Sequence, residues 1–433
     1  MAPGPLRGFR DYPPPDAGAR SELRRRMRAA ARRAGFTELE VPTVESFELF
    51  QKKSGEEVAQ QAWTFTDKGD RTVALIPEQT PSLARIFVER AKAEPMPVKW
   101  FTVSKSWRYE EPQAGRTREF VQFNLDILGV AGVEAEAELL GAADLLLQEV
   151  GASGLYLFRL NDRAFAEALG RLWGAGDRLA FFRAVDRFRK VSPAEFLADL
   201  SRAGVAEGRT QELADLLRAA GDGLAPSALE GFFARLVGLG LDEPGKVGLE
   251  RLRKLFALLE RLGLSDRIVF DPTIVRGLAY YTSSVFEAFA RSGEGRSILG
   301  GGRYDHLVEL FDGPPTPAIG LAVGDQTLEL LLREGGRWPE GEPPLDTYVV
   351  VANPTLAPEA FELVGVLRRA GVSAEADLLG RSMSRQLREA ARRRARRALI
   401  LGLREASPGA LIERDLTTGT QRQLARDAAV RPG

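Results

Sequence analysis

Apolar and polar residues alternate in two segments, 101–110 and 118–127, that flank a short loop. This pattern constrains the fold more than any other part of the chain. In each segment the apolar side chains share one parity and the polar side chains the other. The apolar set is Phe101, Val103, Trp107, Val121, Phe123, Leu125 and Ile127. Since successive side chains of a strand point to opposite faces, the alternation predicts two half-buried strands joined through a loop around Pro112 and Gly115.

If those two strands pair, one face of the sheet carries a dense polar set. Its members are Arg108, Glu110, Arg118, Gln122 and Asp126. Polar residues gathered on one sheet face predict a polar ligand. The arginines of the connecting loop favour a ligand that contains phosphate, because a guanidinium group binds phosphate oxygens in a bidentate manner.

Composition removes several kinds of chemistry. The chain of 433 residues has no cysteine and one histidine, His306, which excludes disulfides, thiolate zinc sites and a cysteine nucleophile. Any metal is expected to be a hard, oxygen-bound ion such as Mg²⁺. The sequence lacks an apolar run of the roughly 18 residues that a membrane span needs, and its N-terminal residues lack the apolar core of a secretory signal. We therefore expect a cytoplasmic protein with no membrane partner.

Charge is balanced overall and uneven locally. Lysine plus arginine and aspartate plus glutamate both number 60, so the protein is not a general binder of polyanions. Residues 381–404 are rich in arginine with one acid, Glu389, and residues 20–33 are similarly basic. Each basic run fits either a nucleic-acid contact or a solvated helix face.

The chain divides by composition and periodicity. Residues 17–34, 134–150, 357–370 and 382–396 predict helices, and residues 63–77 predict a hairpin. Thr80 is expected as an N-cap, with Pro81 as the first helical residue. Residues 165–262 predict a helical insertion. A Gly- and Pro-rich linker at 333–345 separates an expected catalytic domain, 1–332, from a small α/β domain, 346–433.

Several separated motifs together resemble one family. Residues 108–120 resemble motif 2 of the class II aminoacyl-tRNA synthetases, an R-x-E strand followed by a loop and a Phe strand. Residues 275–287 and 299–311 resemble the two signature blocks of the histidyl-tRNA synthetases, and residues 77–85 resemble their amino-acid-binding turn. The C-terminal domain, with D-L-x-G-R-S at 377–382, resembles an anticodon-binding domain.

This resemblance implies a fold and a reaction. The fold would be α+β, with a mainly antiparallel catalytic sheet, a helical insertion and a small α/β C-terminal domain. The reaction would join L-histidine to histidine tRNA by way of histidyl-adenylate, with ATP and its Mg²⁺ as co-substrate and no metal cluster built from protein side chains. A carboxylate is already a nucleophile at neutral pH, so positioning and charge stabilisation suffice for catalysis. Motif 1, at residues 17–42, implies a homodimer.

The resemblance also assigns roles at the nucleotide. Arg108 and Arg276 would hold the α-phosphate from two sides and serve as the catalytic residues. Glu110 would accept from the adenine amino group and Phe120 would stack on the ring. The remaining nucleotide contacts would be Arg116 and Gly301, the latter through the close backbone approach of Gly300–Gly302. A surface Arg–Glu pair and a tight glycine turn are the alternatives.

The amino-acid pocket follows from the same resemblance. Asp126 and Tyr281 would read the imidazole ring, Tyr304 would shape the pocket, and Glu78, Thr80 and Gln122 would receive the α-amino group. Arg108 and Arg276 would contact the histidine carboxylate. Thr80 as a helix cap alone, and Tyr280 or Tyr281 as core residues, are the alternatives. Since Tyr280 and Tyr281 alternate, one of them should face the ligand unless Gly277 introduces a bulge.

Three positions depart from the family pattern. Asp126 stands where members commonly have glutamate, Ala279 where many have aspartate, and Thr327 where motif 3 usually ends in an arginine that contacts the ATP tail. The archaeal-like branch of the family shows similar changes. Two further functions stay open: a histidine-sensing regulatory subunit of ATP phosphoribosyltransferase, and a ligase for free amino acids. Arg276 and the C-terminal domain argue against the first, and the arginine-rich helix argues against the second.

Overall fold

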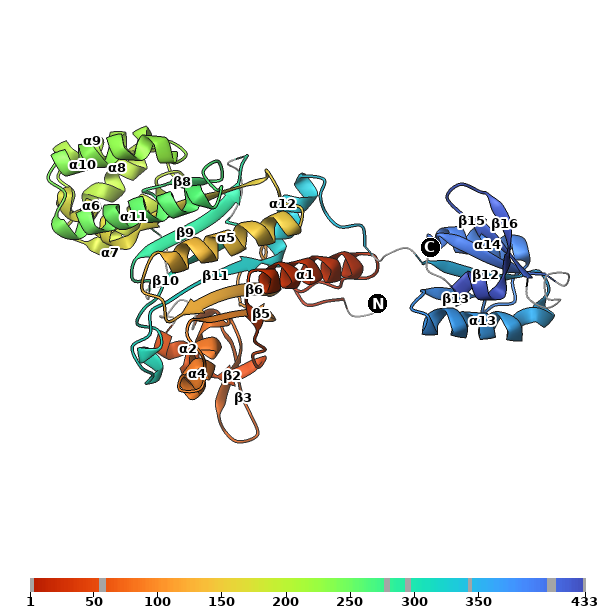
Figure 1. Cartoon of the computed structure of the whole chain (residues 1–433). Helices are drawn as coiled ribbons and strands as arrows, with labels where there is room; N and C mark the ends of the chain where they lie inside the picture. The colour runs from red at the N-terminus through yellow and green to blue at the C-terminus, as the bar shows by residue number, and fades with distance from the viewer. Residues whose placement is uncertain are drawn as a thin grey trace. The chain divides into compact units, whose positions relative to one another are not determined.

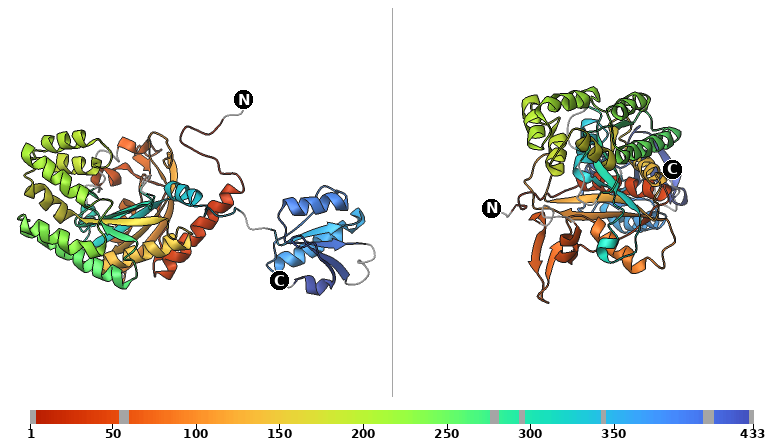
Figure 2. Two further views of the ribbon diagram at one scale, coloured as in Figure 1. Left: turned by 90° about the horizontal axis from the view of Figure 1, so that it is seen from above. Right: turned by 90° about the vertical axis from the view of Figure 1, so that its left-hand side faces the viewer.

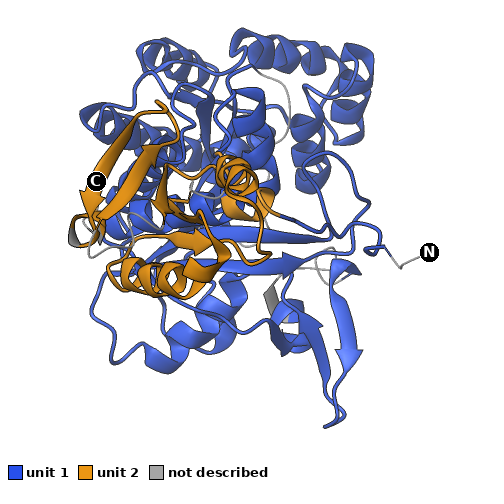
Figure 3. Ribbon diagram, turned by 90° about the vertical axis from the view of Figure 1, so that its right-hand side faces the viewer, with its two compact units in different colours: residues 1–13, 19–339 blue, residues 14–18, 340–433 orange. Residues whose placement is uncertain are grey.

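The computed structural model describes residues 4–53, 60–275, 281–292, 297–341, 345–402 and 410–430. The chain forms two compact units (Figures 1 and 3). The first comprises Met1–Pro13 and Ala19–Pro339, and the second comprises Pro14–Gly18 and Glu340–Gly433.

An eight-stranded sheet is the centre of the first unit. In spatial order its strands are β1 (Thr37–Glu38), β5 (Val98–Trp107), β6 (Glu119–Leu128), β11 (Ala318–Gly324), β10 (Leu299–Arg303), β9 (Ser284–Ala290), β7 (Tyr156–Asp162) and β8 (Ile268–Phe270). The interior pairs are antiparallel, and the outer pairs β1–β5 and β7–β8 are parallel. This confirms the predicted mainly antiparallel sheet.

The paired strands β5 and β6 follow the predicted alternation. Phe101 and Phe123 stack with ring centroids 5.5 Å apart and belong, with Leu125 and Ile127 of β6, to the main core. Helices α1 (Asp16–Arg33) and α5 (Glu134–Glu149) supply apolar side chains to the same core, so they cover this face of the sheet (Figure 2). The other face is left for a smaller cluster and for the polar side chains of β6.

A small sheet and two helices pack beside the opposite face. The strands are β2 (Val44–Ser46), β4 (Thr72–Leu75) and β3 (Trp63–Thr66), in that order, and the predicted hairpin is β3–β4. Helices α2 (Phe47–Lys53) and α4 (Thr80–Arg90) accompany them. The predicted N-cap was wrong: Thr80 is the first residue of α4, and Gln79, already in helical geometry, is the N-cap without a side-chain cap bond.

Residues between β7 and β8 form the predicted helical segment. The helices are α6 (Arg163–Leu172), α7 (Arg178–Arg187), α8 (Pro193–Arg202), α9 (Glu207–Ala219), η1 (Pro226–Ala228), α10 (Leu229–Gly238) and α11 (Glu243–Arg261). Asp162, Asp177, Ser192 and Asp242 cap four of them through side-chain oxygens. The first unit also contains η2 (Glu309–Phe311) and α12 (Asp325–Glu334), which follows β11 directly.

The second unit is a small α/β fold, as predicted. Its sheet has the order β13 (Ala374–Ala376), β12 (Thr347–Val351), β14 (Arg397–Leu401), β15 (Ala410–Asp415) and β16 (Gln421–Ala425). The first three strands are parallel and the last two add antiparallel. Helices α13 (Ala357–Arg369) and α14 (Met383–Arg392) pack in separate cores on opposite faces, and η3 (Pro354–Leu356) and η4 (Arg426–Val430) complete the unit.

Candidate active site

A cavity of about 1610 Å³ opens on the sheet face opposite α1 and α5. Gln122 and Asn124 of β6 line it, whereas Phe123 between them belongs to the core. Strands β9, β10 and β11, the segment before α4, the loop between β5 and β6, the start of α12 and helices α6, α7 and α8 also line it. The predicted site residues that line it are Glu78, Thr80, Arg108, Glu110, Arg116, Phe120, Gln122, Tyr281, Gly301 and Tyr304.

Asp126 is not among the residues that line this cavity, but it is hydrogen-bonded to Tyr304, which does line it. Its side chain is buried, and the Tyr304 hydroxyl donates a hydrogen bond to Asp126 Oδ1. Gly320 of β11 faces Asp126 in register, and a Cβ there would overlap Asp126 Oδ1 and lie 2.6 Å from the Tyr304 hydroxyl. The missing side chain at Gly320 therefore makes the room that the carboxylate and the phenol share.

Burial keeps the proton on Tyr304. Tyr304 is 2% exposed, and burial, followed by the negative charge of Asp126, raises the pKa of its hydroxyl well above the ordinary value. The hydroxyl thus keeps its proton near neutral pH and donates a hydrogen bond to the carboxylate. The fixed Tyr304 hydroxyl therefore sets the direction in which the Asp126 carboxylate can accept a hydrogen bond.

A second polar network lies between β6 and the start of α4. Gln122 Nε2 donates to Asn124 Oδ1 at 2.8 Å, and Asn124 Nδ2 donates to Thr80 Oγ1 at 3.4 Å. Gln79 Nε2 donates to the Gln122 carbonyl at 2.9 Å, and Thr102 donates to Gln79 Oε1. Thr80 is therefore more than the start of a helix, because its hydroxyl joins the pocket wall.

Sequence reasoning missed Gln79 and Asn124. Asn124 shares the parity of Gln122 and Asp126, so the alternation of β6 already placed it on the pocket face. Gln79 lies between two residues that were predicted, and its amide holds the α4 segment against β5 and β6 through Ser104 and Gln122. The contacts of Gln79 therefore hold residues 78–80 together against the sheet.

Arg108 is held at the pocket wall by the segment between β4 and α4. Its Nε donates to the Pro77 carbonyl at 2.9 Å, and its guanidinium carbon lies 5.3 Å from the centroid of the Phe120 ring. Within the described residues no protein group accepts from its two terminal nitrogens. Two N–H-bearing nitrogens on a fixed arginine are suited to an incoming oxyanion.

The loop residues follow a different arrangement from the predicted polar face. Glu110 pairs with Arg116 rather than Arg108, and Gln113 and Arg116 close the turn through paired backbone hydrogen bonds. Arg118 does not reach the pocket: its guanidinium lies over the Tyr109 ring at 3.9 Å, and its Nε donates to the Glu110 carbonyl at 3.1 Å. Strand β5 ends before Arg108 and β6 begins after Arg118, so alternation does not govern the residues between them.

The glycine run lies within a strand, so the alternative of a tight turn was wrong. Gly300, Gly301 and Gly302 all belong to β10. A Cβ on Gly301 would overlap the Gly320 carbonyl and lie 2.7 Å from the Phe286 ring. The glycine permits close packing of β10 against its neighbours at the pocket wall. Arg303, next in sequence, is structural, because it is buried in an ion pair with Glu136 of α5.

Arg276 and Tyr280 lie outside the described residues, as do Gly277 and Ala279. Tyr281 is described and lines the pocket. His306 is exposed at the surface, 3.6 Å from Glu309. Within the described ranges, no group of three or more His, Asp or Glu residues is arranged to hold a metal ion.

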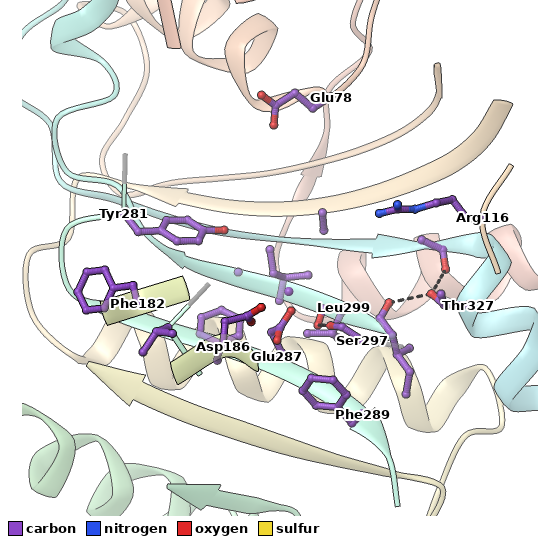
Figure 4. A pocket seen from close by; sticks show the side chains of 18 of the residues that line it. Glu78, Arg116, Phe182, Asp186, Tyr281, Glu287, Phe289, Ser297, Leu299 and Thr327 are labelled. Atoms are coloured by element: carbon purple, nitrogen blue, oxygen red, sulfur yellow. Dashed lines mark hydrogen bonds between the residues drawn. The ribbon is translucent and has the colours of Figure 1, made fainter. Parts of the chain in front are cut away.

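The position of the motif 3 arginine is occupied by a shorter side chain. Thr327 Oγ1 donates to the Gly324 carbonyl at 3.2 Å, and Figure 4 shows Thr327 and Arg116 together at one end of the pocket, away from Tyr281. The loop of Arg116 lies against this part of α12, since a Cβ on Gly115 would come within 3.3 Å of Thr327 and 3.0 Å of Leu330. Arg116 is thus the described cation that lies beside Thr327.

Helices α6, α7 and α8 add basic side chains that sequence reasoning did not assign to the site. The pocket is lined by Arg163, Arg178, Arg183, Arg187, Lys190 and Arg202. Most of them pair with carboxylates of the same helices, but Arg183 has no ion pair within the described residues. The signal was present as basic residues in the helical segment, but the sequence did not indicate which face they share.

An antiparallel sheet that carries this pocket on one face, joined in the same chain to a small α/β unit, defines a protein of the class II aminoacyl-tRNA synthetase type. The sequence pattern described as histidyl-tRNA synthetase matches residues 8–328, and the anticodon-binding-domain pattern matches residues 346–431. A protein named histidine–tRNA ligase from Thermoplasma volcanium is 38% identical, with 96% of this chain and 95% of that protein covered. The chain belongs to the histidyl-tRNA synthetase family.

Solved structures agree on the fold. Histidyl-tRNA synthetase from Nostoc superposes with a TM-score of 0.86 at 24% identity, covering 99% of this chain and 98% of that one. A protein described as an ATP phosphoribosyltransferase regulatory subunit/histidyl-tRNA synthetase from Bacillus halodurans has a TM-score of 0.75 at 23% identity, covering 93% of this chain and 99% of that one. None of the helices in the described part of the chain has the length and apolar character needed to cross a membrane.

Proposed function

We propose that this protein is a histidine–tRNA ligase. A histidine carboxylate oxygen attacks the α-phosphorus of ATP, the bond to the bridging oxygen breaks, and pyrophosphate leaves. The 3′-terminal ribose hydroxyl of histidine tRNA then attacks the carbonyl carbon of the adenylate, its proton leaves, and AMP departs. The observation that carries the proposal is one cavity lined by Arg108 and by Tyr304, whose hydroxyl donates to Asp126, in a chain 38% identical to a histidine–tRNA ligase over 96% of its residues.

The nucleotide would lie along β6 and the loop before it. Arg108 would bind the α-phosphate and the histidine carboxylate, with Arg276 as the second catalytic arginine. Phe120 would stack on adenine, Glu110 would accept from its amino group, and the Gly301 backbone would approach the nucleotide. The support for Arg108 is its fixed Nε and its two terminal nitrogens, which have no protein partner among the described residues.

Histidine would lie with its ring toward Asp126. The carboxylate would accept from one ring nitrogen, Tyr281 and Tyr280 would contact the ring, and Glu78, Thr80 and Gln122 would receive the α-amino group. Tyr304 would hold the carboxylate in its orientation. A buried acceptor rejects an apolar isostere strongly, because its own hydrogen bond would be lost.

The ATP tail would bind without a motif 3 arginine. Arg116 lies at the Thr327 end of the pocket and would move from Glu110 to the β- and γ-phosphates. Mg²⁺ would arrive with those phosphates. Glu287 and Asp186 line the pocket and could complete its oxygen shell (Figure 4). Asp186 pairs with Lys190 at 2.9 Å.

The remaining assignments extend the family resemblance to the whole chain. Residues 1–332 would form the catalytic domain, with 165–262 as a helical insertion, 333–345 a linker and 346–433 the anticodon-binding domain. Residues 17–42 would form the interface of a homodimer, which light scattering in solution would test. A cytoplasmic location follows from tRNA and ATP as substrates.

The proposal is tested by histidine-dependent exchange of pyrophosphate into ATP, followed by charging of histidine tRNA. We expect both activities with Mg²⁺. Arg108→Ala and Arg276→Ala should each lower exchange by at least about a hundredfold, because their interactions are strongest in the transition state. Arg218→Ala, an exposed arginine on α9 that does not line the cavity, serves as the matched control.

The outcomes separate the alternatives. Histidine binding without exchange would mean that the protein is a regulatory, histidine-sensing protein and not an enzyme. Exchange without transfer to tRNA would instead favour a ligase for free amino acids.

A further inference from the structure

Residues 6–12, called the N-terminal segment below, lie against the loop that joins β5 to β6. The Gly8 carbonyl accepts a hydrogen bond from the backbone N–H of Arg118 at 2.8 Å. The Arg118 carbonyl in turn accepts from the backbone N–H of Arg108 at 3.0 Å. The N-terminal segment is therefore connected to the backbone of Arg108, which is proposed to bind the α-phosphate, through a single intermediate residue.

Gly8 allows this close approach. It has a positive φ of 86°, and a Cβ there would lie 2.7 Å from Arg118 Cγ and 3.0 Å from Pro112 Cγ. Arg118 is itself fixed, because its guanidinium lies 3.9 Å from the centroid of the Tyr109 ring and its Nε donates to the Glu110 carbonyl at 3.1 Å. A side chain at position 8 would therefore strain the backbone and displace the loop.

Three aromatic rings make a second connection between the N-terminal segment and the loop. The centroids of the Phe9 and Trp63 rings are 5.8 Å apart, those of Trp63 and Tyr109 are 5.0 Å apart, and both pairs meet edge to face. The backbone N–H of Tyr109 donates to the Gln61 carbonyl at 2.7 Å. Tyr109 is 55% exposed, so this part of the loop is held by its neighbours and not by burial in a core.

The end of the N-terminal segment is held by helices of the first unit. The Tyr12 hydroxyl accepts from Gln326 Nε2 at 3.2 Å, and the Arg20 guanidinium carbon lies 3.7 Å from the centroid of the Tyr12 ring. Gln326 belongs to α12 and Arg20 to α1. The N-terminal segment is thus fixed to regular elements at one end and to the loop at Gly8 and Phe9.

The N-terminal segment can act on a bound nucleotide only through that loop. None of residues 6–12 lines the cavity, whereas Glu110 and Arg116 of the loop do. The pairing of β5 with β6 ends at Trp107 and Glu119, so strand pairing does not fix the residues between them. The contacts that hold Glu110 and Arg116 in place therefore include those made by the N-terminal segment.

We propose that the N-terminal segment positions the nucleotide-binding loop, and that Gly8 is the positioning residue on which this depends. The segment holds the loop in the shape that brings Glu110 to adenine and Arg116 to the ATP tail. Arg108 has a separate contact through its side chain, which donates to the Pro77 carbonyl, so the contacts of Glu110 and Arg116 should be lost first. This inference rests on the proposed charging function and adds a residue outside the cavity to its machinery.

Gly8→Ala is tested against Gly4→Ala, which adds the same methyl group to the same end of the chain. A Cβ on Gly4 has no atom within 4 Å. In pyrophosphate exchange we expect Gly8→Ala to raise the KM for ATP roughly tenfold, within the factor of about a hundred that a misplacement of about 1 Å can cost. The KM for histidine should change by less than about twofold, and Gly4→Ala should leave both constants unchanged.

A second pair of variants keeps the inference testable if Gly8→Ala does not fold. Phe9→Leu removes one edge-to-face contact and keeps an apolar side chain, and it should raise the KM for ATP about threefold, because such contacts are weak individually. Its control is Leu6→Ala, at a side chain that is 70% exposed. A purely structural role would lower the unfolding temperature of Phe9→Leu and leave its KM for ATP unchanged, and that result would overturn the inference.

Trypsin cleavage after Arg116 and Arg118, followed by mass spectrometry, measures the loop directly and without catalysis. We expect faster cleavage in Gly8→Ala than in Gly4→Ala, because a loop released from the N-terminal segment opens to the protease. Equal rates would mean that the loop holds its own shape, which contradicts the proposal.

Exchange by the unaltered protein separates this inference from the function on which it rests. No exchange there would overturn the proposed function. Normal exchange, with the KM for ATP unchanged in both Gly8→Ala and Phe9→Leu, would overturn the role of the N-terminal segment alone.

Discussion

At the scale of single residues, Asp126 depends on neighbours that fix the direction of its carboxylate. Tyr304 donates to one carboxylate oxygen, and Gly320 leaves the space in which the two groups meet. Aspartate is one methylene shorter than the glutamate common in the family, so the position of its carboxylate is set by the strand and not by side-chain freedom. The proposed contact with the imidazole therefore tolerates little change.

Asp126→Asn tests that contact with almost no change in volume. An amide keeps the shape but loses the charge and turns one acceptor into a donor. We expect kcat/KM for histidine in pyrophosphate exchange to fall by at least about a hundredfold, with the KM for ATP nearly unchanged. Asp222→Asn, at an 89% exposed side chain in the same unit, is the control. Equal losses in the ATP and histidine constants would mean that Asp126 supports the fold and does not read the substrate.

At the scale of elements, a buried ion pair ties α1 to α12 and β6. Arg20 donates to Asp325 Oδ2 at 2.6 Å and pairs with Glu329, and the backbone N–H of Val121 donates to Asp325 Oδ1 at 2.9 Å. Burial is the first cause of the raised pKa of Asp325. Asp325, two residues before Thr327, thus joins α1, α12 and β6 behind the pocket.

Arg20→Ala should destabilise the first unit by about 3–5 kcal/mol, because it leaves a buried carboxylate without its cation. Arg33→Ala, whose side chain is 58% exposed, should cost about 1 kcal/mol or less. Urea unfolding followed by tryptophan fluorescence measures both, since all five tryptophans lie in this unit. If Arg20→Ala lowers the free energy of unfolding less than Arg33→Ala does, Asp325 and Glu329 gain enough water to remain charged without Arg20.

Glu22 on α1 gives the same helix a dependence on acid. Hydrogen bonds from Arg25 lower its pKa to about 2 from the ordinary 4.5, with Arg26 adding to the effect. A depressed pKa stabilises the folded state above pH 4.5, and that contribution is lost as the pH falls toward about 2. After allowance for solvent screening, the contribution is on the order of 1 kcal/mol.

Glu22→Gln should therefore lower stability near neutral pH and make a much smaller difference at about pH 2, where the carboxyl is protonated in the unfolded state and about half protonated in the folded state. Urea unfolding at the two pH values measures this. A difference that does not shrink at the lower pH would assign the effect to packing instead of charge.

The paired strands show why the sequence predicted some elements and not others. Period-two alternation between Phe101 and Ile127 reports a real physical repeat, so the strands and their buried faces were predictable. Beyond the strand ends no repeat applies, and Arg118, Glu110 and Arg116 adopted contacts set by the turn. Likewise Gln79 took helical geometry and used its amide for strand carbonyls, so the capping preference of Thr80 did not decide where α4 begins.

At the scale of the whole molecule, net neutrality conceals basic regions. Lysine plus arginine and aspartate plus glutamate each number 60, yet Arg183 on the pocket wall has no ion pair among the described residues, and residues 381–404 hold many arginines and one acid. The family resemblance supplied the roles of distant motifs because it covers nearly the full chain. It could not show that α6, α7 and α8 turn basic side chains toward the sheet, because that depends on how the helices pack.

Salt should separate the two half-reactions. The KM for tRNA should rise by roughly tenfold or more between about 50 and 200 mM salt, because bound phosphates release counterions. The KM for histidine in exchange should change far less, since its contacts are buried and screened weakly. Steady-state charging and exchange at matched salt measure this. A KM for tRNA that does not vary with salt would mean that arginine contacts with the tRNA phosphates contribute little to binding.

Gly320 has a consequence for anyone who wishes to alter the amino acid that this enzyme accepts. The space it leaves is already filled by Asp126 and Tyr304, so adding a side chain there removes the reader of the ring without creating a new one. Enlarging the pocket for a ring-substituted histidine must begin at Asp126 or Tyr304 and leave Gly320 in place. A mutagenesis screen that varies only residues with functional side chains would leave out Gly320, although Gly320 limits which substitutions at Asp126 and Tyr304 can be accommodated.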